Sequence, residues 1–273
     1  MKNLRKTRLI LAGLFLVLSV AYVFAGGWAG RLGTLSFRSQ IIPSMISVAL
    51  GATLFWLVIT IIYGRIYCAT VCPAGTLIDI ASRLRRFLPA SRRRYRYRPR
   101  RQARYHILAV YAICLIAGIT VVPALIEPWN IFANIAAVAR PDASALAAAG
   151  LGIGAATGIA AGAASLLAMA AVSVLWGRGF CNTVCPVGTV LSIAGSNAAY
   201  RIEIDPDRCT GCLICEDVCP AGCVKVVGRY VDDQRCVRCM KCVDSCPDGA
   251  IRWQSGRNRA ATPLMKRAKS GGV

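Results

Sequence analysis

The sequence has 273 residues, of which 56% are hydrophobic, and it carries a formal net charge of +21 at pH 7 and 14 cysteines. This composition excludes an ordinary soluble domain, which is less apolar. The basic residues are concentrated in the segments that connect the apolar stretches. Together, the high apolar content and this distribution of charge indicate a membrane protein.

Apolar stretches of about 20 residues are long enough to cross a bilayer, and they predict membrane spans. The predicted spans lack Asp, Glu, Lys and Arg in their interiors and run from Leu9 to about Trp28, Ile41 to Tyr63, Ile107 to about Leu125, and Ala145 to Trp176. Basic residues precede the first span and crowd the segment between the second and third. By the positive-inside rule, both termini face the cytoplasm.

The first span has a competing interpretation. A basic start, an apolar run and Val23-Phe24-Ala25 before glycine are also typical of a cleaved secretory signal. The apolar run is long for a signal, which favours a retained span. In either case the cysteine-rich C-terminus ends in the cytoplasm, where 14 thiols are better explained as metal ligands than as disulfides.

The fourth span carries glycine at every fourth position, at Gly150, Gly154, Gly158 and Gly162. Small residues at this interval let a neighbouring helix approach closely within lipid, so they predict a helix contact face. The alternative is that the Ala/Gly richness reflects only a compositional bias.

An internal repeat follows the second and fourth spans. Each copy reads Gly-Arg-x-aromatic-Cys-x-x-x-Cys-Pro, with its arginine at Arg65 or Arg178 and its cysteines at Cys68 and Cys72 or at Cys181 and Cys185. The repeat indicates two duplicated halves, each a transmembrane hairpin. Cysteines at i and i+4 share one face of a helix, so we expect the four thiols to meet at the membrane surface.

The chemistry of these four thiols is open from the sequence. They suit a third iron-sulfur centre or a thiophilic metal such as copper or zinc. A redox-active disulfide and simple buried packing remain alternatives. The two arginines either offset thiolate charge or anchor the helix ends at lipid phosphate.

The C-terminal region carries two copies of Cys-x-x-Cys-x-x-Cys-x-x-x-Cys-Pro. In this pattern three cysteines bind one 4Fe-4S cluster and the fourth binds the neighbouring cluster. The sequence therefore assigns one cluster to Cys209, Cys212, Cys215 and Cys246, and the other to Cys236, Cys239, Cys242 and Cys219. Zinc is the alternative, but it does not need eight cysteines in two cross-shared runs.

Other candidate residues carry weaker signals. Cys223 and Cys114 are interpreted as packing residues. His106, the single histidine, lies at the cytoplasmic edge of the third span and is a candidate for the headgroup of a quinone, as are Glu127 and Trp129 on the outer side. The Arg-rich segment from Arg83 to Arg104 is expected to lie on anionic lipid rather than to bind nucleic acid.

The predicted fold class is an α-helical membrane protein with four transmembrane helices in two duplicated hairpins, followed by a small α+β ferredoxin-like domain with two clusters. The expected boundaries are a first hairpin (1–64), a cysteine segment with a basic loop (65–106), a second hairpin (107–177), a second cysteine segment (178–200), the ferredoxin-like domain (201–254) and a basic tail (255–273).

This combination of spans, two Cys-x-x-x-Cys-Pro motifs and two ferredoxin motifs resembles the NapH-type membrane ferredoxins. Their relatives serve methylamine utilisation and nitrous oxide reductase maintenance. The resemblance implies an electron-transfer subunit of the bacterial inner membrane, at most one subunit of a quinol dehydrogenase. It would take electrons from the quinone pool and pass them to a partner ferredoxin or cytochrome of a periplasmic reductase. The alternative is a maturation factor that uses Cys68, Cys72, Cys181 and Cys185 to reduce or deliver a metal such as copper.

Overall fold

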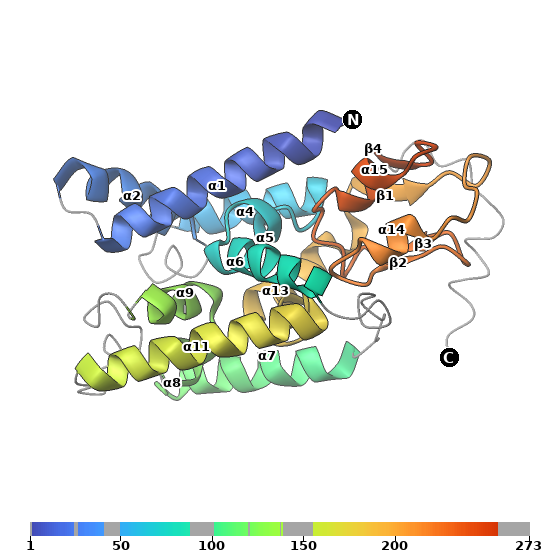
Figure 1. Ribbon diagram of the computed structural model, residues 1–273. Helices are drawn as coiled ribbons and strands as arrows, with labels where there is room; N and C mark the ends of the chain where they lie inside the picture. The colour runs from blue at the N-terminus through green and yellow to red at the C-terminus, as the bar shows by residue number, and fades with distance from the viewer. Residues whose placement is uncertain are drawn as a thin grey trace.

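A computed structural model describes residues 2–24, 27–40, 50–87, 101–119, 121–136, 138 and 155–255. In Figure 1 the helices of the first two thirds of the chain lie roughly along one direction. The residues from 200 onward form a small unit at one end, close to the N-terminus of the first helix. The basic run at 92–100 and the tail from 256 lie outside the described residues.

The first half contains a helix that was expected to be a loop. This helix, α2 (Gly27–Ser39), folds back along α1 (Lys2–Phe24). The Ser19 and Ser36 hydroxyl oxygens are 2.8 Å apart, and the Tyr22 and Phe37 rings are stacked with their centroids 4.8 Å apart. Gly33 permits this approach, because a Cβ there would overlap the Tyr22 backbone. The next described helix is α4 (Leu50–Tyr63).

The first cysteine motif does not form one continuous helix. A short α5 (Tyr67–Thr70) ends before Cys72, which is extended (φ −69°, ψ 115°) and caps α6 (Pro73–Ala81). Because proline disfavours the helical conformation of the preceding residue, Cys72 begins a new helix instead of continuing the old one. The expectation that Cys68 and Cys72 share a helix face is therefore wrong. A 3-10 turn, η1 (Ser82–Phe87), follows α6.

The second half repeats this plan. Its elements are α7 (Arg101–Ile116), α8 (Val121–Ile126), α9 (Pro128–Ala136), α11 (Ala155–Trp176), α12 (Gly179–Thr183), α13 (Pro186–Ala194) and the 3-10 turn η4 (Gly195–Asn197). Cys185 takes the same position as Cys72, extended and directly before a helix-starting proline. Gly162 of α11 lies against the Asn134 carbonyl of α9, so this glycine forms a helix contact within the chain. Gly150 and Gly154 lie outside the described residues.

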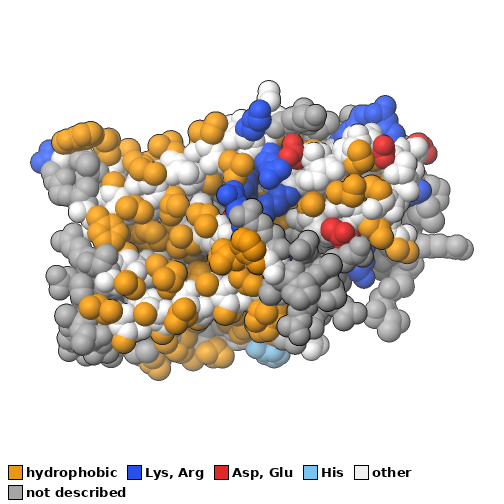
Figure 2. Space-filling view, in the orientation of Figure 1, with side chains coloured by type: hydrophobic (Ala, Val, Ile, Leu, Met, Phe, Trp, Pro, Cys, Tyr) orange, Lys and Arg blue, Asp and Glu red, His pale blue; other side chains and the backbone are white. Residues whose placement is uncertain are grey.

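Among the described residues, two helical stretches are long and apolar enough to cross a membrane, Asn3–Phe24 and Ile159–Trp176. The shorter apolar helices Gly51–Tyr63 and Gln102–Ile116 overlap parts of the other two predicted spans. The third predicted span is not one continuous helix, because α7 ends at Ile116 and a separate helix begins at Val121. Figure 2 shows hydrophobic side chains over the helical part, and Lys and Arg side chains gathered where it meets the C-terminal unit.

The C-terminal unit consists of two small antiparallel sheets with short helices between their strands. β1 (Tyr200–Ile204) pairs with β4 (Ile251–Ser255), and β2 (Val224–Lys225) pairs with β3 (Tyr230–Val231). The helices are α14 (Ile214–Asp217) and α15 (Lys241–Ser245). Ile202, Ile204 and Ile251 of the longer sheet are buried together with several of the cysteines.

The C-terminal unit is packed onto the helices by specific contacts. The Arg178 backbone N–H donates to the Pro220 carbonyl at 2.8 Å, and the Ala199 N–H donates to Ile61 at 3.1 Å. The Tyr63 ring at the end of α4 stacks on Tyr200, with ring centroids 5.2 Å apart. The end of α4 is thus held directly against the cysteine-rich unit.

Candidate functional site

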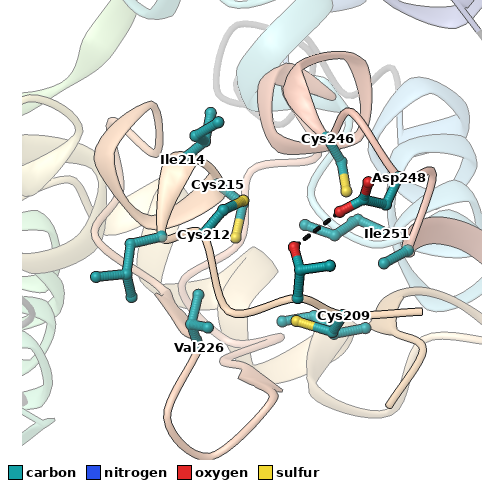
Figure 3. A pocket seen from close by; sticks show the side chains of 12 residues that line it. Cys209, Cys212, Ile214, Cys215, Val226, Cys246, Asp248 and Ile251 are labelled. Carbon is teal, nitrogen blue, oxygen red and sulfur yellow. Dashed lines mark hydrogen bonds between the residues drawn. The ribbon is translucent and has the colours of Figure 1, made fainter. Parts of the chain in front are cut away.

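Four of the predicted cluster cysteines line one pocket near the surface, which we call the solvent-side pocket: Cys209, Cys212, Cys215 and Cys246. Figure 3 shows these side chains around one space, with Ile214, Val226 and Ile251 among the apolar residues of its wall. Cys212 is exposed, and Cys209 and Cys246 are partly exposed. Asp248 also lines this pocket, and its carboxylate accepts a hydrogen bond from the Thr210 hydroxyl at 2.8 Å.

The other four line a second, buried pocket, which we call the helix-side pocket: Cys219, Cys236, Cys239 and Cys242. A fifth thiol, Cys223, lines this pocket as well. The Cys219 and Cys223 sulfurs are 3.5 Å apart, and the Cys223 thiol also interacts with Cys236. Cys223 was expected to be a packing residue only, and it is in direct contact with two of the predicted ligands.

The backbone turns that present the cysteines are the same in both motifs. Gly211 and Leu213 have positive φ values of 76° and 63°, and Arg238 and Met240 have 55° and 59°. In each motif, the two left-handed residues lie directly before the second cysteine and directly after it. For Arg238 this left-handed conformation is unfavourable, and it persists only where the surroundings enforce it.

The thiols of the helix-side pocket are not electrostatically equivalent. Contact with the Cys223 thiol is the largest cause that lowers the pKa of Cys236, to about 6, despite the opposing effect of burial. Burial raises the pKa of Cys239 to about 11, and burial also raises the pKa of Cys242 well above its ordinary value. In the solvent-side pocket, burial raises the pKa of Cys215 to about 11.

The four thiols of the Cys-x-x-x-Cys-Pro repeat meet in one buried core, which we call the thiol core: Cys68, Cys72, Cys181 and Cys185. These thiols lie inside the helical part, packed among Tyr67, Val71 and Leu191. The side chains of these three neighbours are exposed by 2% or less. Cys185 interacts electrostatically with the other three thiols. The four thiols of the repeat thus converge, and they do so in the buried core of the protein.

The two halves exchange their arginines around this core. Arg65 of the first half donates to the Cys181 carbonyl of the second at 2.9 Å, and Arg178 donates to the Cys68 carbonyl of the first at 2.6 Å. Both arginines are at most 1% exposed. The suggestion that they anchor the protein at lipid phosphate is therefore wrong, because neither side chain reaches the surface.

A buried carboxylate joins the thiol core to the rest of the molecule. Asp79 of α6 is paired with Arg178 at 2.9 Å and with Arg8 of α1 at 3.0 Å, and Lys241 of α15 lies 3.9 Å away. Burial alone would raise the pKa of Asp79, but Arg178, Lys241 and Arg8 hold it well below its ordinary value. Three cations from three separate elements thus converge on one anion.

Each pocket offers four thiols on a mainly apolar wall, a donor set that fits a 4Fe-4S cluster. In such a cluster every cysteine binds a different iron, so the sulfurs surround a volume. Within the described ranges, no three His, Cys, Asp or Glu side chains are arranged to hold a single metal ion.

The remaining candidates lie apart from the cysteine pockets. Cys114 is partly exposed in α7, and His106 is exposed at the surface of the same helix. Glu127, between α8 and α9, is 4% exposed and accepts a hydrogen bond from the Asn130 side chain at 2.9 Å. Burial raises the pKa of Glu127 to about 8. Trp129 is buried nearby, at the start of α9.

Sequence reasoning missed Asp79 and Gln40. The Gln40 side chain at the end of α2 accepts from the Tyr67 hydroxyl at 2.6 Å and donates to the Val71 carbonyl at 3.3 Å. A single Asp in the apolar stretch after Pro73 was the available signal for a buried ion pair. No local pattern marked Gln40.

Comparison with known protein families identifies two kinds of 4Fe-4S binding domain. One family model, described as a 4Fe-4S binding domain, matches residues 45–91 and 159–197, so its two segments contain the two halves of the thiol core. A second 4Fe-4S binding domain matches residues 202–225 and 229–252, which hold the cysteines of both pockets. The C-terminal unit therefore binds 4Fe-4S clusters.

Three curated proteins are similar to most of the chain. Ferredoxin-type protein NapH of Haemophilus influenzae is 25% identical over 186 residues, and NapH of Escherichia coli is 26% identical over 186 residues. Methylamine utilization ferredoxin-type protein MauN of Methylorubrum extorquens is 25% identical over 185 residues. Each match covers 67–68% of this chain and 57% of the relative. No solved structure matches the chain.

Proposed function

This chain is an iron-sulfur, ferredoxin-type electron-transfer protein related to NapH and MauN, and we propose that it conducts electrons from membrane quinol to a redox partner outside the bilayer. When bound, the clusters supply one-electron carriers, so the chain itself needs to bind, space and insulate them. The proposed ligands are Cys209, Cys212, Cys215 and Cys246 in the solvent-side pocket and Cys219, Cys236, Cys239 and Cys242 in the helix-side pocket.

The observation that carries this proposal is the continuity between the thiol core and the helix-side pocket. Cys239, one of the proposed cluster ligands, is packed in the same buried cluster as Cys68, Cys72, Cys181 and Cys185. Residues of both pockets in turn share the core of the C-terminal unit. A row of sulfur sites thus runs from inside the helical part to the exposed Cys212.

The thiol core is the proposed entry to this row. A 4Fe-4S domain model covers both of its halves, which favours a third iron-sulfur centre over packing alone. The crossed arginines support a charged centre, because Arg65 and Arg178 both interact with the Cys181 thiol in a fully buried site. Buried cations of this kind offset the negative charge of metal-bound thiolates.

The proposed topology has four membrane spans, with both termini and the C-terminal unit in the cytoplasm. Two of the spans meet the length criterion within the described residues, and the apolar surface of Figure 2 supports their burial in lipid. The proposed domains keep the expected boundaries at 64, 106, 177, 200 and 254. The change from helices to sheets at Tyr200 supports the boundary at 200.

Glu127 is the proposed proton acceptor for quinol. Its carboxyl group is buried between α8 and α9. Ionisable side chains that are buried in the apolar interior of a membrane protein usually have a function. The Tyr111 phenol interacts electrostatically with both Glu127 and Cys185, which supports a link between this acid and the thiol core. Asn130 holds the carboxylate in position. The exposed His106 has no such setting.

The test is reduction of the purified full chain by a quinol analogue without oxygen. We expect the visible absorption of the oxidised clusters to bleach with quinol as completely as with dithionite. Fewer than about eight irons per chain, or bleaching by dithionite alone, would contradict the proposal. Cys212→Ser and Cys239→Ser should each lose iron, whereas Cys114→Ser, outside the row of sulfur sites, should not.

The second candidate function is metal handling by the thiol core. Four buried thiols with arginine neighbours are the donor type that a soft metal such as copper prefers. Because the described side chains are not already arranged around a single ion, this function requires the thiols to move together when the metal binds. This function predicts about one copper per chain that is lost in Cys68→Ser and Cys181→Ser. Iron in excess of the two ferredoxin-type clusters, lost in the same variants, would instead assign the core to a third iron-sulfur centre.

A further inference from the structure

The two C-terminal motifs are copies of one another, so each position in one has a counterpart in the other. Aligning Cys209 with Cys236 places Arg238 opposite Gly211, Asp248 opposite Ala221 and Cys223 opposite Ala250. Asp248 and Ala250 line the solvent-side pocket, and Ala221 and Cys223 line the helix-side pocket. Gly211 and Arg238 lie outside both linings, in the turns between the first two cysteines of each motif.

The first difference is a buried charge. Arg238 is fully buried beside the helix-side pocket, where it donates to the Tyr63 carbonyl at 3.3 Å and interacts with the Cys236 thiol. Its partner Asp233 (2.9 Å) is also paired with Arg201 (3.4 Å), and the buried Asp232 interacts with Asp233 as well. Gly211, at the equivalent place in the other motif, has open space around it. Arg238 keeps the left-handed backbone for which its counterpart uses glycine.

The second difference is a hydrogen-bond donor. Once Cys219 and Cys236 bind iron as thiolates they have no proton to give, so Cys223 is the donor and gives its one thiol proton to one or the other sulfur. The Cys223 backbone N–H also points at the Cys219 sulfur, at 3.5 Å. In the solvent-side pocket the matching residue is Ala250, whose side chain cannot donate, so the Cys223 thiol is the difference between the two pockets.

The third difference has the opposite sign. Asp248 brings a carboxylate to the wall of the solvent-side pocket, where Ala221 stands in the helix-side pocket. The Thr210 hydroxyl is occupied by Asp248. All three differences therefore place positive charge or donors at the helix-side pocket and negative charge at the other.

Reduction adds a negative charge to a cluster, and its potential depends on net charge, hydrogen bonds to sulfur and solvent exposure. Burial disfavours that charge, and the helix-side cysteines are all buried. We propose that Arg238 and Cys223 are positioning residues that raise the reduction potential of the helix-side cluster and keep it reducible despite its burial. This inference rests on the proposed binding of one cluster in each pocket.

The test is a redox titration of the anaerobic full chain followed by electron paramagnetic resonance, with iron counted for every variant. Arg238→Gln and Cys223→Ala should each lower one midpoint and leave the other in place. Arg238→Lys and Cys223→Ser, which keep the charge or a donor, should retain most of the wild-type value. Asp248→Asn should raise only the midpoint of the solvent-side cluster, which Arg238→Gln and Cys223→Ala leave unchanged.

The inference is overturned if Arg238→Gln and Asp248→Asn move the same midpoint, or if Cys223→Ala leaves both midpoints unchanged. If Arg238→Gln loses iron, Cys223→Ala and Cys223→Ser decide alone, because they differ only in a small side chain. Wild-type protein with fewer than about eight irons would refute the proposed function itself, an outcome distinct from full iron content with unshifted midpoints.

Discussion

At the scale of single residues, Gly75 and Gly188 hold equivalent places in the two halves of the thiol core. A Cβ on Gly75 would overlap the Cys68 carbonyl and approach Arg178, and a Cβ on Gly188 would overlap the Cys181 carbonyl and approach Arg65. Glycine is thus required at both positions, because each packs against the carbonyl of the first cysteine of its own half and against the arginine of the other half.

Gly188→Ala should therefore destabilise the protein by about 1–3 kcal/mol, because the overlap is with backbone that cannot move independently. Gly51→Ala is the matched control, since Gly51 also lies in a helix but has nothing near its Cβ position. Thermal unfolding in detergent measures both. Equal midpoint temperatures for the two variants would show that the turn has room to spare.

Glu127 gives a pH-dependent prediction. Its pKa of about 8 means that the carboxylate, the form that accepts a proton, is a minority at neutral pH. The rate of quinol-driven reduction should rise as the pH increases through about 8, and Glu127→Gln should lower it about 100-fold and remove this rise. Stopped-flow bleaching measures the rate. Reduction by dithionite is the control, and Glu127→Gln should leave its rate unchanged. If the pH profile of quinol-driven reduction is unchanged in Glu127→Gln, a group other than Glu127 accepts the proton.

At the scale of elements, Asp79 ties α1, α6, the start of α12 and α15 together through ion pairs. Because its pKa is lowered in the folded protein, its contribution to stability is complete above the ordinary carboxyl pKa of 3.8 and declines as the pH falls below that value. At neutral pH the whole contribution is present.

Asp79→Asn should cost about 3–5 kcal/mol at pH 7, because it leaves Arg8 and Arg178 buried without their anion. Asp207→Asn, at an exposed position, is the control and should change stability by no more than about 0.5 kcal/mol. Chemical unfolding monitored by cluster absorption compares them. A small effect of Asp79→Asn would mean that water or another anion reaches this site.

At the scale of the whole molecule, the cysteine spacings carried the most information. Ligands three residues apart must lie close, so the grouping of Cys209, Cys212 and Cys215 follows from the chain itself, and repetition suggested that the thiol core would form. The exchange of Arg65 and Arg178 was not predictable, because their partners lie over 100 residues away. The helix at 27–39 was missed because its glycines, serines and arginines read as a loop.

The proposed orientation predicts where proteases act. A C-terminal tag on the full chain should be cleaved by trypsin in inside-out membrane vesicles and protected in right-side-out vesicles, since the C-terminal unit is expected in the cytoplasm. Immunoblotting of the tag measures this, with a known periplasmic protein as the control for sealed vesicles. Cleavage from the outer face would reverse the topology.

The crossing of the two arginines also bears on the order of events during synthesis. Cys68 and Cys72 leave the ribosome early, but Arg178, which seals their site, is made more than 100 residues later. The first half alone holds only two of the four thiols. The proposed four-thiol centre can therefore be completed only after Cys181 and Cys185 have also been made.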